Sequence, residues 1–229
     1  MPETGIATAV TSTRTTPAAA VERLWKRYPD GTVALADVSL RVGAAERVLV
    51  TGPLGSGTST LLRILSGRSV PTRGRARVLG VPVHLSDPRS LRTLRSRVAL
   101  LDGALHLPGD ATPLEALDVA AARARRPGRR PIDLLDDIGG LAPDRPVRDL
   151  DGAERALLGL ALVAARRPRL VVADDPWAAL DPGQGFAIGR LACRIVGELD
   201  AAFVLAGRDA GAVDGIDRAV RLEAGRVVA

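Results

Sequence analysis

The segment Gly52–Thr60 constrains the fold of this chain more than any other feature. It follows the apolar run Val48–Val50 and precedes the helical run Leu61–Leu65. An apolar run, a glycine-rich connection and a helical run in direct succession predict a strand, a tight loop and a helix. The rest of the chain is interpreted around this unit.

The loop resembles the phosphate-binding pattern G-x-x-x-x-G-K-[ST]. Gly52, Gly57 and Ser59 match it, whereas Thr58 stands at the lysine position. Glycines let successive backbone N–H groups curl around a polyphosphate at a helix N-terminus, where the helix dipole also favours anions. Threonine keeps this curl but removes the ammonium that would neutralise the β- and γ-phosphates during transfer. The loop therefore predicts phosphate binding with weakened transfer chemistry; the alternative is a glycine-rich turn that binds nothing.

The chain has 229 residues, of which 46% are hydrophobic and 2% aromatic. This length fits one α/β domain, with or without a subdomain, and the core must be aliphatic. The single cysteine, Cys193, excludes an intramolecular disulfide and fits a reducing cytoplasm. Residues 1–20 lack a basic start followed by an apolar block, so we expect a flexible tail rather than a signal peptide.

The apolar and charged runs of the sequence bear on membranes and nucleic acids. The longest apolar run, Ala156–Ala165, is shorter than the roughly 20 residues that cross a bilayer, so membrane association requires a partner. The net charge of +6 suggests nucleic acid or an anionic surface, or else a background of abundant arginine. The run Arg123–Arg130 either contacts phosphates or is a solvated helix end. Lys26 is the one lysine, so no neighbouring lysine replaces the residue missing from the loop.

The N-terminal part alternates apolar and polar residues. Val21–Tyr28 and Thr32–Val42 predict an antiparallel pair of strands around a Pro-Asp-Gly turn. Tyr28 either packs across this pair or stacks on a purine ring. Arg75–Leu79, bounded by glycines, predicts another strand.

Residues 88–160 differ in character from the rest of the chain. Helical periods at Thr112–Arg126 and Pro131–Ile138 stand among several prolines. We expect a helical subdomain here, inserted into an α/β core formed by residues 21–87 and 161–229.

An apolar run, Leu170–Asp174, follows the expected subdomain and ends in the carboxylates Asp174 and Asp175. A buried parallel strand reads as a continuous apolar run, and carboxylates at its C-terminal edge suit a metal bound to phosphates. The alternative is a strand that enters an Asp-Pro turn. The remaining predictions are a helix at Gly185–Leu199, a strand at Ala202–Ala206, and a hairpin formed by Arg218–Leu222 and Arg226–Val228.

The order of these features, from Val21 to Val228, resembles the nucleotide-binding domain of ABC (ATP-binding cassette) transporters. The resemblance implies an α/β P-loop NTPase fold of the ABC cassette type, with an antiparallel β subdomain and an inserted α-helical subdomain. It implies ATP and Mg²⁺ as cofactors, the metal lying at Ser59 and Asp174. Tyr28 is similar to the family's adenine-stacking aromatic. The residues similar to its phosphate loop, Walker A, are Gly52, Gly55, Ser56, Gly57, Thr58, Ser59 and Thr60.

The resemblance also assigns contacts with partners. Asp181 is similar to a residue that touches an opposing cassette, and Asp102 or Gly103 occupies the place of a glutamine that senses a permease. Asp175 and Arg208 stand where the family has its catalytic glutamate and switch histidine. The signature sequence corresponds to Leu150, Asp151, Gly152, Ala153 and Glu154.

Several of these positions depart from the family pattern, which marks the chain as a degenerate member. Asp175 is one methylene shorter than glutamate and would hold a catalytic water poorly. Arg208 adds positive charge near the place of a γ-phosphate. Asp151 replaces a serine and can cap the following helix, but it brings a carboxylate towards the γ-phosphate of a nucleotide on the partner. The other departures are Thr58, Ala153, and Asp102 or Gly103 at the place of the sensing glutamine.

The resemblance implies a cytoplasmic subunit, peripheral on the inner face of the cell membrane. It would dock on an integral membrane permease and pair with a second cassette as a homodimer or heterodimer, with ATP hydrolysis impaired. One alternative is a fully active transport ATPase in which Asp175 and Arg208 have taken over the missing roles. Another is a nucleic-acid-associated cassette, which only the charge suggests, so no nucleic-acid partner is expected.

Overall fold

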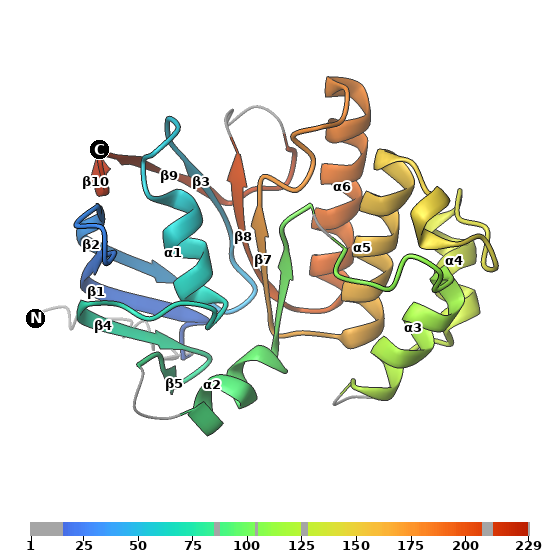
Figure 1. The fold of residues 1–229 in the computed structure, drawn as a ribbon, viewed down its shortest axis with the longest axis horizontal. Helices are drawn as coiled ribbons and strands as arrows, with labels where there is room; N and C mark the ends of the chain where they lie inside the picture. Colours follow the sequence, from blue (N-terminus) through green and yellow to red (C-terminus); the bar gives the residue numbers. More distant parts are fainter. Residues whose placement is uncertain (1–15, 85–87, 104, 125–127, 208–212, 229) are drawn as a thin grey trace, which may run out of the picture.

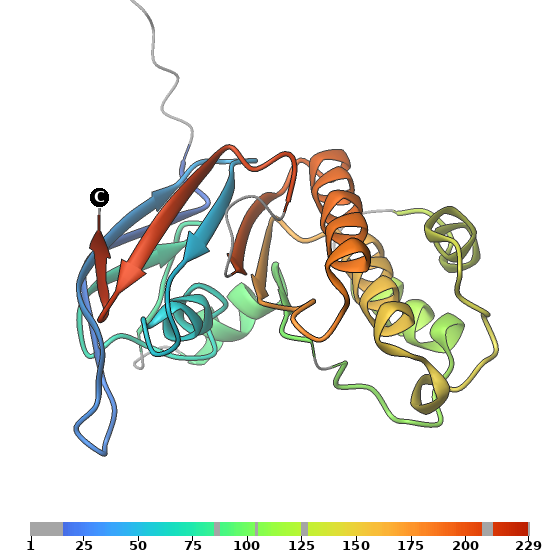
Figure 2. The ribbon, with the colours of Figure 1, turned by 90° about the horizontal axis from the view of Figure 1, so that it is seen from above.

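The computed structural model describes residues 16–228 except 85–87, 104, 125–127 and 208–212. Two sheets with helices between and beside them make up this part of the chain (Figures 1 and 2). In chain order the elements are β1 (Ala19–Arg27), β2 (Val33–Val42), β3 (Arg47–Thr51), α1 (Thr58–Leu65), β4 (Arg73–Val78), β5 (Val81–Pro82), α2 (Pro88–Arg95), β6 (Val98–Leu101), α3 (Pro113–Ala122), α4 (Pro131–Ile138), the 3₁₀ turn η1 (Val147–Asp149), α5 (Gly152–Arg166), β7 (Leu170–Asp174), α6 (Pro182–Glu198), β8 (Ala202–Gly207), β9 (Arg218–Glu223) and β10 (Arg226–Val228).

The two sheets differ in strand direction. The smaller sheet, in the order β2-β1-β4-β5, is antiparallel throughout. The core sheet runs β10-β9-β3-β8-β7-β6 and is parallel except for the antiparallel pair of β9 and β10. β3, β7 and β8 are apolar and buried along nearly their whole length, as expected of parallel strands covered on both faces.

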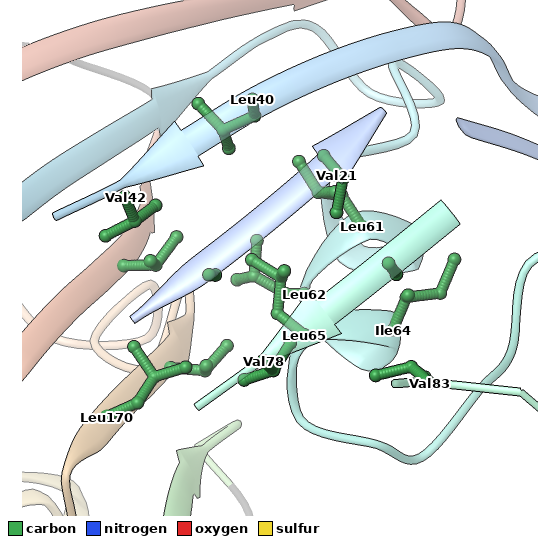
Figure 3. Close-up of a cluster of buried hydrophobic side chains, with 14 of the residues drawn as sticks. Val21, Leu40, Val42, Leu61, Leu62, Ile64, Leu65, Val78, Val83 and Leu170 are labelled. Atoms are coloured by element: carbon green, nitrogen blue, oxygen red, sulfur yellow. The ribbon is translucent and has the colours of Figure 1, made fainter. Parts of the chain in front are cut away.

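Helices cover the core sheet on both faces. Figure 1 shows α1 between the antiparallel sheet and the core sheet, α5 and α6 on the other face, and α3 with α4 beyond them. α1 buries Leu61, Leu62 and Leu65, which pack among strand residues such as Val78 and Leu170 (Figure 3). Aliphatic packing therefore holds the helix that follows the glycine loop between the two sheets.

The structure confirms several predicted elements. β7 and α4 occupy the predicted residues, and β9 and β10 form the predicted hairpin. The first two strands pair in antiparallel fashion, as the alternation of apolar residues indicated. The predicted helix after β7 begins earlier, at Pro182, because Asp181 caps it there.

The structure differs from the predicted domain boundaries in three places. β1 begins at Ala19, and Ala18 and Ala19 are buried, so the expected tail of residues 1–20 does not extend to residue 20. Val98–Leu101, placed in the helical subdomain by the range 88–160, forms β6 beside β7 in the core sheet. Such a short apolar run gives no period that could distinguish a core strand from a helix segment. α5 also continues past residue 160, to Arg166, so one helix joins the helical subdomain to the core.

Within the part of the chain that the structure describes, no helix combines the length and apolar character needed to cross a membrane.

Leu62 provides a test of the packing around α1. Its side chain is fully buried, so Leu62→Ala is expected to lower the free energy of unfolding by about 2–5 kcal/mol through lost burial and an unfilled cavity. Val227→Ala, at a position that is 41% exposed, should change stability by no more than about 0.5 kcal/mol. Urea denaturation of both variants measures the difference, and equal losses would contradict this account of the core.

Candidate functional site

Two glycines of the loop between β3 and α1 pack directly against backbone from other strands. A Cβ atom on Gly52 would lie 2.3 Å from the carbonyl oxygen of Leu222, and one on Gly57 would lie 2.2 Å from that of Ala34. Gly57 also has a φ of 98°, a left-handed conformation that favours glycine, and it stands at the N-cap of α1. These positions cannot accept a side chain, so backbone contacts determine the shape of the loop.

The C-terminal hairpin holds this loop from the other side. The N–H of Gly225 donates to the carbonyl of Ser56 (2.9 Å), and its carbonyl accepts from the N–H of Ala36 on β2 (2.8 Å). Ser56 itself is buried. The turn between β9 and β10 thus joins the loop to the antiparallel sheet. The sequence predicts this hairpin but not its contact with the phosphate loop, because no local pattern indicates which distant turn will contact a loop.

Thr58, at the position of the missing lysine, is bonded within the loop. Its hydroxyl lies 2.8 Å from the hydroxyl of Ser56. The ammonium of Lys26 is used elsewhere, because it donates to the carbonyl of Val70 (2.9 Å), beyond the end of α1. The first turn of α1 therefore carries no lysine, and it has no acidic residue either.

Ser59 and Asp174 meet as the resemblance implied. The Ser59 hydroxyl donates to a carboxylate oxygen of Asp174 over 2.9 Å, which joins the start of α1 to the end of β7. Mg²⁺ prefers oxygen ligands and usually takes only one or two from the protein, with the rest from phosphates and water. A hydroxyl and a carboxylate at the mouth of a glycine loop fit this ion. Among the described residues, no group of three or more His, Cys, Asp or Glu forms a different metal site.

Tyr28 lies beside the same helix. Its hydroxyl is 3.2 Å from that of Thr60, and the ammonium of Lys26 stands 5.3 Å from the centre of its ring. Tyr28 follows Arg27, the last residue of β1 paired with β2, so it stands just beyond the strand pair. The aromatic residue and the phosphate loop are neighbours, as a purine-stacking role requires.

Asp175 follows β7 with a backbone φ of 44°, which is uncommon for a residue with a side chain. Its N–H donates to the carbonyl of Ala206 at the end of β8 (3.2 Å). Asp175 lines a cavity of about 490 Å³ together with Trp177, Asp181 and apolar residues from the ends of β7, β8 and α6. Arg208, the other predicted catalytic residue, lies outside the described residues.

The predicted signature residues surround the start of α5. Asp151 accepts from the N–H of Glu154, and Glu154 accepts from the N–H of Asp151, both over 2.8 Å. This reciprocal capping box satisfies two N–H groups at the start of the helix, so Asp151 acts as the predicted cap. Leu150 is buried, and Ala153 packs at the edge of the core.

The signature segment also contacts the loop after β7. A Cβ atom on Gly152 would lie 3.1 Å from the side chain of Leu180. The next residue, Asp181, caps α6 by accepting from the N–H of Gln184 (2.9 Å). The predicted signature and the predicted dimer-contact residue therefore belong to one continuous surface.

The predicted permease-sensing position forms an ion pair with an arginine. Asp102 lies 3.5 Å from the guanidinium of Arg68, and Gly103 follows it with a φ of 73°. Burial lowers the pKa of the nearby Arg166 guanidinium, and the positive charges of Arg123 and Arg68 lower it further. Arg68 therefore lies near both the carboxylate of Asp102 and the guanidinium of Arg166.

The arginine run at Arg123–Arg130 is paired in part with the next helix. Arg130 bonds both carboxylate oxygens of Asp133, and Arg129 forms an ion pair with Asp137. Residues 125–127 of this run lie outside the described residues. Arg129 and Arg130 thus support the interpretation of a solvated helix end, because both guanidinium groups form ion pairs with carboxylates of α4.

A glycine loop that enters a helix, a parallel strand that ends in an aspartate beside it, an antiparallel sheet and an inserted helical subdomain define an ATP-binding cassette of the P-loop class. The family described as ABC transporter matches residues 35–178. The chain belongs to this family, and the described part has the fold of its ATP-binding domain. Domains of this family bind ATP, with Mg²⁺ as the usual metal.

Curated relatives agree with this assignment. The lipoprotein-releasing system ATP-binding protein of Bordetella pertussis is 34% identical over 226 residues, which are 93% of this chain and 96% of that protein. The phosphonates import ATP-binding protein of Anaeromyxobacter dehalogenans is 34% identical over 174 residues, or 70% of this chain and 35% of that protein. A putative ABC transporter ATP-binding protein of Methanopyrus kandleri is 35% identical over 75% of this chain and 63% of its own length. This chain therefore spans less than two thirds of the latter two proteins.

Solved structures have the same fold. The protein cbiO1 of Clostridium perfringens, part of the ABC transporter complex cbiONQ, is similar with a TM-score of 0.80 and 23% identity over 93% of this chain and 87% of that one, which supports the architecture alone. The same holds for a dimeric bacterial ABC transporter cassette, with a TM-score of 0.78, 24% identity, and coverage of 92% of this chain and 97% of that one.

Asp151 provides a test of the signature region. Asp151→Ala removes the side chain that accepts from the N–H of Glu154, so unfolding should become easier by about 0.5–2 kcal/mol. Asp151→Asn keeps an oxygen acceptor at the cap and should lose far less. Thermal denaturation monitored by circular dichroism compares the two, and an Asn variant as unstable as the Ala variant would count against the capping role.

Proposed function

We propose that this chain is the ATP-binding subunit of an ABC transporter that binds Mg-nucleotide but hydrolyses ATP poorly. The observation that carries the proposal is the pairing of Ser59 with Asp174 (2.9 Å) beside a loop whose lysine position holds Thr58. The parts that receive a nucleotide and its metal are present, whereas the charge that assists transfer is missing.

Nucleotide binding is supported by the backbone of the loop. Gly52 and Gly57 give it a shape that closely packed carbonyls from Leu222 and Ala34 maintain. The loop ends at the N-terminus of α1. The unpaired N–H groups and the positive end of the dipole of that helix are therefore available to a phosphate. When bound, Mg²⁺ supplies a positive charge to the phosphate oxygens, and Ser59 and Asp174 would hold it.

Impaired hydrolysis is supported by the neutral side chain at residue 58. The Thr58 hydroxyl bonds Ser56, and the lone lysine of the chain bonds Val70 beyond α1. Phosphoryl transfer depends on positive charge around the γ-phosphate, so its loss slows the chemical step more than it weakens binding. Asp175, shorter than a glutamate and placed on a left-handed backbone, has less reach towards an attacking water.

Partners follow from the same surfaces. We infer that Asp102 and its partner Arg68 lie near an integral membrane permease, and that Asp181 lies near a second cassette. The subunit is then peripheral on the inner face of the cell membrane. The names of its relatives cover phosphonates, methionine and lipoproteins, so what the relatives share is the ATP-binding cassette rather than one cargo.

A fully active ATPase is the second candidate, favoured by the position of Asp175 in the cavity at the ends of β7 and β8. It predicts a measurable rate that Asp175→Asn abolishes. The leading proposal predicts that the natural chain has so little activity that this substitution changes almost nothing.

Restoring the lysine tests the leading proposal. Thr58→Lys returns an ammonium to the first turn of α1, so steady-state Mg-ATP hydrolysis should rise by about tenfold or more over the natural chain. Thr93→Lys, on the exposed surface of α2, is the matched control and should leave the rate unchanged. If the natural chain hydrolyses ATP as fast as Thr58→Lys, the claim that its hydrolysis is impaired is wrong.

The metal site has its own test. Asp174→Asn removes the negative charge that faces Ser59, so affinity for a fluorescent ATP analogue should fall roughly tenfold in Mg²⁺ and much less in EDTA. Asp110→Asn, on an exposed loop, serves as the control. Equal affinities with and without Mg²⁺ in the natural chain would argue against a metal at this place.

A further inference from the structure

A cavity of about 410 Å³ lies where the helical subdomain meets the core. Its lining comes from α4, from the end of α5 and from the C-terminal half of α6, three helices that stand next to one another in Figure 1. This volume falls within the range of about 300–1,000 Å³ that is usual for small-molecule sites. We call this space the α4–α6 cavity.

The α4–α6 cavity is separate from the candidate nucleotide site. Ala164 and Arg167 line it at the end of α5, whereas Asp151 caps the start of that helix. The 15 residues of α5 span roughly 22 Å at about 1.5 Å per residue. Residues between 191 and 199 of α6 also line the cavity, whereas Asp181 caps the start of α6. The cavity therefore lies at the far ends of both helices from the predicted signature and the predicted dimer contact.

Two hydrophobic cores meet at the wall of the cavity. Leu134 on α4 belongs to the core of the helical subdomain, and Ile195 on α6 belongs to the core between the large sheet and its helices. Ile138 and Ala164 pack against both cores. All four residues line the cavity, so an apolar ligand there would contact the subdomain and the core at once.

The charged residues around this apolar wall leave one positive charge unmatched. They are Arg129, Asp137, Arg167, Arg194 and Glu198. Arg129 forms an ion pair with Asp137, and Arg194 and Glu198 stand one turn apart on the exposed side of α6. The charges within each of these couples offset each other, which leaves the guanidinium of Arg167. A ligand with one negative charge would balance the set.

Arg167 is held in place but lacks an acceptor. A Cβ atom on Gly128 would lie 3.3 Å from the Cδ atom of Arg167, so the backbone before α4 packs on the stem of this arginine. In the part of the chain that the structure describes, its Nε–H is the one buried side-chain donor without a hydrogen-bond partner. The partial negative charge at the end of α5, about half an elementary charge, is too small to neutralise the guanidinium. Because buried polar groups are nearly always hydrogen-bonded, an acceptor from outside the chain suits this place.

We propose that the α4–α6 cavity binds a small organic acid, whose carboxylate pairs with Arg167 and whose apolar body lies against Leu134 and Ile195. Arginine binds carboxylates through two parallel hydrogen bonds. A linear acid of about eight to ten carbons has a size that such a cavity holds. The bound acid ties α4 of the helical subdomain to α6 of the core. The inference does not depend on the proposed function, because the two sites share no residue.

The test titrates the full chain with decanoate by isothermal titration calorimetry. The natural chain should bind one decanoate. The affinity should rise from hexanoate to decanoate, by up to about fourfold for each buried methylene group. Decanol has the same apolar body without the charge, so it should bind at least tenfold more weakly.

Two variants change opposite parts of the site. Arg167→Gln removes the positive charge, and Ala164→Leu takes up space in the cavity while keeping a good helix former in α5. Each should lower the affinity for decanoate at least tenfold. Arg92→Gln, at an exposed arginine of α2, is the matched control and should bind decanoate as the natural chain does.

The outcomes that would overturn the proposal are distinct. They are no saturable binding by the natural chain, equal binding by both variants, or hexanoate that binds as tightly as decanoate. Displacement of decanoate by saturating Mg-ATP would place the acid at the phosphate loop and would also overturn it. Circular dichroism checks the fold of each variant, and Ala164→Leu decides the question if Arg167→Gln does not fold. Mg-ATP binding is measured in parallel, so that failure of the proposed function is seen separately from failure of this site.

Discussion

Close packing of backbone against two glycines is the constraint on which the site depends. Gly52 and Gly57 bring the phosphate loop against carbonyls of β9 and β2, at distances that leave no room for a Cβ atom. The N–H of Gly225 adds a hydrogen bond to the carbonyl of Ser56 from the turn that closes the chain. The loop is therefore part of the contact between the two sheets. Its shape depends on main-chain atoms that a change of side chain at residue 58 does not touch.

This constraint explains how a phosphate loop with threonine at residue 58 keeps its architecture. Thr58 stands at the start of α1, where threonine is tolerated, and its hydroxyl bonds Ser56. The carboxylate of Asp174 still faces the hydroxyl of Ser59 at the mouth of the loop. Binding relies on backbone geometry and on a metal, whereas transfer relies on side-chain charge, so the two properties can separate in evolution.

The residues of the predicted signature are held by local structure in a similar way. Asp151 caps α5 as well as a serine would, because either side chain offers an oxygen to the free N–H groups of the first turn. The stability of the fold therefore does not require serine at position 151. What changes is the charge presented at the surface, near Leu180 and Asp181. Thr58 follows β3 and Asp175 follows β7, so both lie near the edge where the parallel strands of the core sheet end, and neither belongs to the aliphatic core.

Local patterns in the sequence determined the glycine loop with its helix, the strand that ends in Asp174 and the C-terminal hairpin, because each is recognised from neighbouring residues alone. The tertiary structure decided what depends on distant residues. It placed the short run Val98–Leu101 in the core sheet beside β7, and it set Gly225 against Ser56. It also brought Arg167 to a cavity lined by α4 and α6. No period or motif encodes these relations, since they arise only when segments far apart in the sequence pack together.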